Sequence, residues 1–142
     1  MKTSESTYNK CMYFVSNALA RKTEKLATAA WKPAGISPSY GYLLMLVLDN
    51  PGAQPGMLSE ELHLTPSTIT RLIEKLEEKK LVIRTTEGKA TNVYPTPKGK
   101  EMLPLLKECT KAFYESYTAI LGRDESARLV HNMGKIADKL EV

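Results

Sequence analysis

The chain has 142 residues, of which 42% are hydrophobic and 25% charged, and its 20 basic and 16 acidic residues give a formal charge of +4. This is the composition of an ordinary globular domain, and it excludes collagen-like and largely disordered chains. The longest strongly apolar run, residues 42–48, is too short for a membrane-spanning helix. The first residues contain no hydrophobic signal core, so we expect a cytoplasmic protein whose two cysteines stay reduced.

Charge is distributed unevenly along the chain. Residues 1–36 and 62–100 each carry a net +4, whereas residues 37–61 carry −3 and residues 101–142 carry −1. A basic segment permits nucleic-acid binding, but it is also typical of a solvated surface. Charge alone therefore does not decide between these two interpretations.

Apolar spacing predicts helices over residues 8–31 and 38–49 and a short helix over residues 57–63. A fourth helix is expected over residues 66–79, because a threonine cap followed by proline at the first helical position suits a helix start. This helix has one apolar face and one short, polar and partly cationic face. The apolar face is formed by Ile69, Leu72, Ile73 and Leu76.

Two β-rich segments, residues 81–86 and 91–95, predict a hairpin with its turn at residues 87–90. Thr96-Pro97 then opens a helix that we expect to end at Gly122, and a last helix starts at residue 123 or 124. Short helix, tight turn, polar-faced helix and basic hairpin is the order of a winged helix-turn-helix. The predicted fold is therefore mainly α with a small β-hairpin wing.

The terminal helices have apolar stripes wider than about 60 central residues can cover. We expect a single domain in which residues 37–96 form the DNA-binding region and residues 1–36 and 97–142 form dimerisation helices. A two-fold dimer is the simplest way to bury such stripes. The alternative is that the terminal helices pack on each other within one chain.

A helix fits the major groove, where base edges can be distinguished. Arg71 can donate two hydrogen bonds to guanine, Thr68 and Thr70 can contact a thymine methyl or a phosphate, and Ser67 lies where a helix N-terminus favours phosphate. Lys75 is expected at the DNA backbone. Lys89 at the hairpin tip can reach a neighbouring minor groove or a phosphate, and Arg84 lies near the hairpin base. The competing interpretation is that these residues are ordinary surface residues. Arg71 would then pair with Glu74 or Glu78, Lys75 would be solvated, and Lys89 would be only a turn residue.

Little in the sequence indicates an enzyme. The two histidines, His63 and His131, have no cysteine or carboxylate at metal-ligand spacing, and there is no phosphate-binding glycine loop. We therefore expect no catalytic residues, no metal and no cofactor. The competing class is a winged helix that contacts another protein without reading DNA.

The stretch from residue 43 to residue 84, followed by the hairpin and PTPKGKEML, resembles the MarR family of bacterial transcriptional regulators. Its most specific part is STITRLIEKL at residues 67–76, and Thr96 to Gly99 looks like the family's Thr-x-x-Gly motif. The resemblance implies a homodimeric repressor that binds double-stranded DNA at a pseudo-palindromic operator. It also implies release by a small aromatic or lipophilic effector, or by an oxidant.

Two departures from the family pattern concern the wing. The tip is short and has no arginine, so Lys89 stands where the family reads the minor groove. Lys80 replaces the glycine that commonly precedes the first wing strand. We expect Lys80 to be left-handed, unless the helix ends differently.

Redox-sensing relatives carry a reactive cysteine in the first helix, which makes Cys11 a redox candidate. Alignment places Tyr13 at that cysteine position instead, so the preferred interpretation of Cys11 is a small buried apolar residue. Five aromatic residues are candidates for an effector pocket, with core and interface packing as the alternative. They are Tyr13, Trp31, Tyr40, Tyr42 and Phe113.

Overall fold

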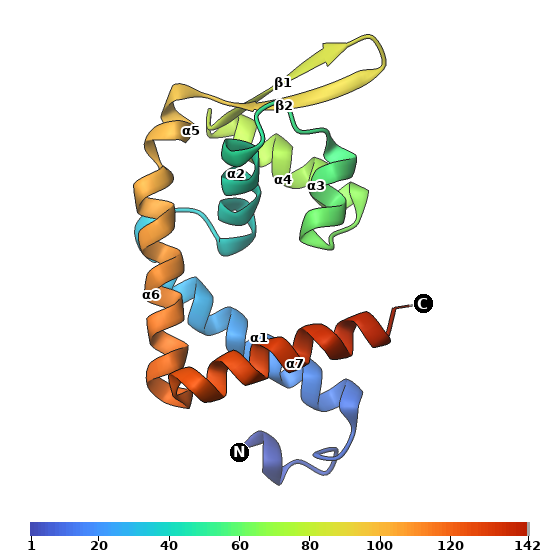
Figure 1. The fold of residues 1–142 in the computed structure, drawn as a ribbon, viewed down its shortest axis with the longest axis vertical. Helices are drawn as coiled ribbons and strands as arrows, with labels where there is room; N and C mark the ends of the chain where they lie inside the picture. The colour runs from blue at the N-terminus through green and yellow to red at the C-terminus, as the bar shows by residue number, and fades with distance from the viewer. Residues whose placement is uncertain (142) are drawn as a thin grey trace. The chain divides into compact units, whose positions relative to one another are not determined.

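The computed structural model describes residues 1–141, and it is mainly helical with one β-hairpin, as the sequence predicts (Figure 1). The prediction of a mainly α winged helix-turn-helix is confirmed. The elements in chain order are a 3-10 turn (Thr3–Glu5), α1 (Met12–Trp31), a second 3-10 turn (Lys32–Ala34), α2 (Pro38–Asp49), α3 (Pro55–Leu62), α4 (Pro66–Glu78), β1 (Val82–Glu87), β2 (Ala90–Pro95), α5 (Pro97–Glu101), α6 (Leu103–Leu121) and α7 (Arg123–Lys139). Within residues 1–141, no helix has the length and apolar character needed to cross a membrane.

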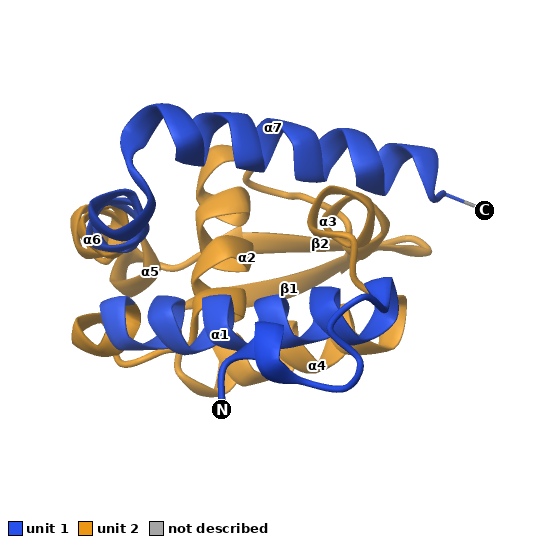
Figure 2. Cartoon of the chain, turned by 90° about the horizontal axis from the view of Figure 1, so that it is seen from below, with its two compact units in different colours: residues 1–30, 110–142 blue, residues 31–109 orange. Residues whose placement is uncertain are grey.

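The chain divides into two compact units (Figure 2). Unit 1 comprises residues 1–30 and 110–142, and unit 2 comprises residues 31–109. In unit 2, α2, α3 and α4 gather beside the hairpin (Figure 1). Its core is built from fully buried aliphatic side chains on all of these elements, among them Leu43, Leu44, Leu58, Ile69, Leu76, Val82 and Val93.

The hairpin is antiparallel and pairs Val82 with Pro95 at its base and Glu87 with Ala90 at its tip. Gly88 closes the turn at φ +64°, a conformation that glycine adopts without a Cβ penalty. The amide of Val93 donates to the carbonyl of Ala53. That bond joins the loop between α2 and α3 to the wing.

The helix ends of unit 2 follow the predicted capping chemistry. The hydroxyl of Thr65 accepts from the Thr68 amide at 3.4 Å, and the hydroxyl of Thr96 accepts from the Gly99 amide at 3.0 Å. Each threonine precedes a proline at the first helical position, where no N–H is needed. His63, expected in the turn between α3 and α4, ends α3 with φ +52°.

Lys80 is left-handed, with φ +61°, which confirms the first of the two expected arrangements. The Lys80 amide donates to the Glu77 carbonyl and the Leu81 amide donates to the Leu76 carbonyl, both at 2.9 Å. This is a Schellman ending, which normally uses glycine at the left-handed position. A lysine there carries a conformational cost that the flanking hydrogen bonds offset.

Three predicted helices have different limits in the structure. The short helix expected over residues 57–63 is α3, which begins at Pro55, a residue suited to the first helical position, and ends at Leu62. The first helix starts at Met12 rather than residue 8, because the preceding residues form a 3-10 turn and bends. The helix expected from residue 97 to Gly122 is interrupted at Met102, dividing it into α5 and α6. Pro104 lacks the amide that a continuous helix would need and its ring clashes with the carbonyl four residues earlier, so the chain restarts at Leu103.

Unit 1 leaves much of its apolar surface uncovered within one chain. Tyr13 is 79% exposed on α1, Ile120 is 71% exposed on α6, and Ile136 is 44% exposed on α7. Met12, Leu19, Leu121, Leu129, Val130, Met133 and Leu140 are exposed as well. Packing of the terminal helices within a single chain therefore does not bury their apolar stripes.

Candidate nucleic-acid interface

Helix α4 divides sharply into a buried and a solvent-facing side. Ile69 and Leu76 are fully buried, and Leu72 and Ile73 are at most 5% exposed. Ser67, Thr70, Arg71 and Lys75 on the other side are exposed, and Thr68 is half-buried. The apolar residues hold the helix on unit 2 while the polar side chains face outward, which is the arrangement a groove-reading helix requires.

The hydroxyl groups near the start of α4 are hydrogen-bonded to the helix itself. Those of Ser67 and Thr68 each lie within hydrogen-bond distance of the Thr65 hydroxyl, at 3.2 and 2.9 Å. The Thr70 hydroxyl donates to the Pro66 carbonyl at 3.0 Å. Its methyl group and its oxygen lone pairs stay available, so Thr70 can offer a methyl contact or accept a hydrogen bond.

Arg71 forms no ion pair among residues 1–141, so the alternative of a surface pair with Glu74 or Glu78 is not found there. Glu78 instead lies 3.6 Å from Lys75, with both side chains more than half exposed. The guanidinium of Arg71 is therefore the exposed, planar donor group on this face of α4. Lys75 has a competing partner on its own helix.

The wing carries two basic residues in different surroundings. Lys89 is exposed at the tip, beside Gly88. Arg84 donates from Nε to Glu77 on α4 at 2.7 Å, which ties the base of the hairpin to the recognition helix. Local sequence patterns do not reveal Glu77 as the partner of Arg84, because six residues and a reversal of chain direction separate the two.

The C-terminal end of α4 is attached to the start of α5. The Thr96 hydroxyl donates to the Lys80 carbonyl at 2.7 Å, and the Thr96 amide donates to the Leu81 carbonyl at 3.0 Å. Gly99 lies against the same Leu81 carbonyl so closely that a Cβ would approach it to less than 3.0 Å. The Thr-x-x-Gly segment thus fixes the position of α4, a role that the helix-start pattern by itself did not reveal.

The five effector-pocket candidates fall in both units. Tyr13 and Phe113 belong to unit 1, whereas Trp31, Tyr40 and Tyr42 belong to unit 2. The ring of Trp31 is buried and contacts Tyr42, with ring centres 5.6 Å apart. A shared pocket of these five residues stays a prediction.

The interpretation of Cys11 as a buried residue is wrong for the single chain, since Cys11 is exposed and Cys109 is the buried cysteine. Cys11 lies just before α1, outside the helical stripe that would have buried it. A redox role of Cys11 stays a prediction. His131 is exposed on α7, as expected for a surface or interface residue.

Residues 34–90, which hold α2, α3, α4, β1 and the hairpin turn, match the MarR family. The resemblance to the MarR family is confirmed. Among curated relatives, the transcriptional regulator SarZ of Staphylococcus epidermidis is 24% identical over 142 residues, covering 98% of this chain and 95% of SarZ. The transcriptional repressor MdtR of Bacillus subtilis is 23% identical over 127 residues, 87% of this chain and 82% of MdtR.

Solved structures of MarR type have the same fold as this chain. The repressor CouR bound to a 23-mer DNA duplex aligns with a TM-score of 0.82 at 20% identity, covering 96% of this chain and 98% of CouR. CouR bound to p-coumaroyl-CoA aligns with a TM-score of 0.83 at 19% identity, with the same coverage. The DNA complex of MepR from S. aureus aligns at 0.79 with 17% identity, covering 92% and 98% of the two chains. These likenesses show that the chain has the winged-helix fold that the sequence predicts.

Proposed function

We propose that the chain is a sequence-specific DNA-binding transcriptional repressor that acts as a homodimer on a pseudo-palindromic operator. One observation carries this proposal: α4 is anchored by four buried aliphatic residues while Thr70, Arg71 and the wing residue Lys89 face solvent. The match of residues 34–90 to the MarR family and the DNA-bound complexes of CouR and MepR support it.

Arg71 carries sequence readout in this proposal, because an unpaired guanidinium can bind the O6 and N7 atoms of guanine together. The shorter side chains on this face contact thymine methyl groups or phosphates in this proposal. They are Ser67, Thr68 and Thr70. Lys75, Arg84 and Lys89 contribute positive charge toward the DNA backbone. Two recognition helices of a dimer enter successive major grooves, about 34 Å apart along the DNA.

The apolar surface of unit 1 supports the dimer. Tyr13, Ile120 and Ile136 are exposed in one chain, and burying such residues is favourable by about 1.5–3 kcal/mol for each large side chain. A second copy of the same helices can bury all of them at once in a two-fold interface. In this proposal, residues 1–36 and 97–142 form the dimerisation helices of the regulator.

A small-molecule or oxidant signal releases the operator in this proposal. The complex of CouR with p-coumaroyl-CoA supports the small-molecule form. Release requires that the signal bind the DNA-incompetent state more tightly than the DNA-competent state.

The proposal is tested by selecting bound duplexes from a random-sequence library and measuring the affinity for the selected site against salt concentration. A repressor of this kind shows a steep linear fall of log K with log salt, because phosphate contacts release counterions. The variant Arg71→Ala is expected to lose about 1–3 kcal/mol and its sequence preference. Arg71→Lys keeps the charge but not the planar fork, so it retains non-specific binding without the preference.

Lys100→Ala is the matched control, because Lys100 is an exposed basic residue of unit 2 outside α4 and the wing. This variant is expected to bind the selected site as the unchanged protein does. A library that yields no enriched duplex would favour the alternative, a winged helix used for protein contact. Specific binding that survives Arg71→Ala would disprove the role of Arg71.

A further inference from the structure

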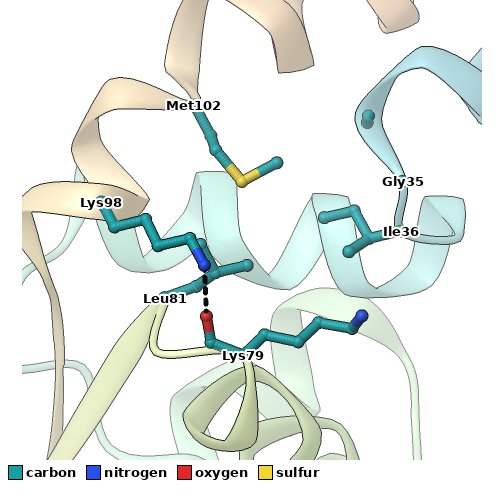
Figure 3. A pocket seen from close by; sticks show the side chains of 7 residues that line it. Gly35, Ile36, Lys79, Leu81, Lys98 and Met102 are labelled. Carbon is teal, nitrogen blue, oxygen red and sulfur yellow. Dashed lines mark hydrogen bonds between the residues drawn. The ribbon is translucent and has the colours of Figure 1, made fainter.

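A cavity of about 180 Å³ that is widely open to solvent lies on unit 2, beside the end of α4 (Figure 3). It is lined by residues from the segment before α2, the end of α4 and the start of α5. These are Ala34, Gly35, Ile36, Lys79, Leu81, Lys98 and Met102. The cavity is therefore separate from the solvent-facing side of α4, and none of the five aromatic effector candidates lines it.

Apolar side chains form part of the cavity lining. The side chains of Ile36 and Met102 reach toward it, and Leu81, which is 2% exposed, lies at its base (Figure 3). No aromatic ring is among the lining residues, so nothing there would stack on a planar ligand. The lining suits a short, flexible hydrocarbon group.

Two positively charged residues also line the cavity, with the ammonium of Lys79 beside Ile36 and that of Lys98 beside Leu81 (Figure 3). Lys79 and Lys98 line the cavity together, no carboxylate lines it, and neither lysine forms an ion pair within the described residues. The ammonium of Lys98 donates to the Lys79 carbonyl at 3.1 Å, which uses one of its three protons. Two ammonium groups at one cavity favour the binding of an anion, because a negative charge close to both is attracted to each of them.

We propose that this cavity binds a short aliphatic carboxylate whose carboxylate group lies between Lys79 and Lys98. Its hydrocarbon chain packs against Ile36, Leu81 and Met102. The cavity, at about 180 Å³, is smaller than the pockets that bind drug-sized ligands, which suits a short acid of about four to six carbons. Such a ligand contacts the last turn of α4, at the opposite end from the Thr65 cap.

The test measures binding to the full-length protein without DNA, so its outcome is independent of the proposed repressor function. Hexanoate is titrated by calorimetry and by the chemical shift of the Met102 methyl group, which is assigned with the variant Met102→Leu. We expect a dissociation constant on the order of 1 mM for hexanoate. The neutral 1-hexanol and the short acetate are each expected to bind at least about fivefold more weakly. 1-Hexanol lacks the carboxylate that the lysines bind, and acetate lacks the hydrocarbon chain that packs against the apolar side chains.

Lys79→Met and Lys98→Met are each expected to weaken hexanoate binding about fivefold or more, because a hydrogen bond to a charged group is lost. Lys100→Met is the matched control, since Lys100 is exposed on the same short helix but does not line the cavity. Thermal unfolding by circular dichroism checks that each variant is folded. Absence of hexanoate binding, equal binding of 1-hexanol, or unchanged affinity in both lysine variants would overturn the proposal.

Discussion

Replacing Gly99 by alanine tests how tightly α5 is packed on the end of α4. A Cβ at this position would lie less than 3.0 Å from the carbonyl oxygen of Leu81 and 3.5 Å from Leu44. An ordinary C···O contact is about 3.3 Å or longer, so the two backbones must separate by on the order of 1 Å. The same Leu81 carbonyl accepts from the Thr96 amide, and this separation strains that bond as well.

Two effects of opposite sign determine the size of the change. Overpacking of this kind costs about 1–3 kcal/mol, whereas replacing glycine by alanine within a helix gains about 0.5–1 kcal/mol. We expect Gly99→Ala to lower the free energy of unfolding by a net value of about 1–2 kcal/mol. For a chain of this length that corresponds to a fall in melting temperature of about 4–8 °C.

The measurement is urea unfolding followed by circular dichroism, at one fixed protein concentration because a dimer's stability depends on concentration. Gly56→Ala is the matched control, since Gly56 lies in α3 with open space where its Cβ would be. This control should be stabilised by about 0.5–1 kcal/mol. If Gly99→Ala were stabilised to the same extent as Gly56→Ala, the close approach to Leu81 would not constrain this junction.

Three further predictions concern the end of α4, the wing and the dimer. Lys80→Gly is expected to raise the free energy of unfolding by about 0.5–1 kcal/mol, because glycine adopts φ +61° without a Cβ penalty; Lys80→Ala in the same urea assay should give no such gain. A double-mutant cycle on Arg84 and Glu77 should give a coupling of about 0.5–1 kcal/mol, since the pair is partly exposed, and a coupling near zero would show that the contact does not hold the wing. Ile136→Glu should convert the proposed dimer into monomers, because a charged side chain would be buried in the interface, and sedimentation measures the molecular mass. If the unchanged protein also sediments with the mass of a monomer, the dimer is refuted.

Local chemistry explains why the sequence predicted the recognition helix and the wing. The Thr65 cap, the proline after it and the apolar spacing of α4 all lie within 14 residues, so they specify the helix and its buried face without distant partners. The hairpin is equally local, because residues 82–95 contain both strands and the glycine turn. The left-handed Lys80 was anticipated from the family resemblance, because Lys80 stands where the family commonly has glycine.

Contacts between distant segments were decided only by the tertiary structure. The Thr96 hydroxyl reaches the Lys80 carbonyl sixteen residues earlier, and Gly99 meets the Leu81 carbonyl, so the Thr-x-x-Gly segment secures α4 in a way that no local pattern reveals. The cavity beside Lys79 and Lys98 likewise needs three separate segments to meet. Sequence periodicity reports which face of an element is buried, whereas side-chain partners across the fold depend on how those faces pack.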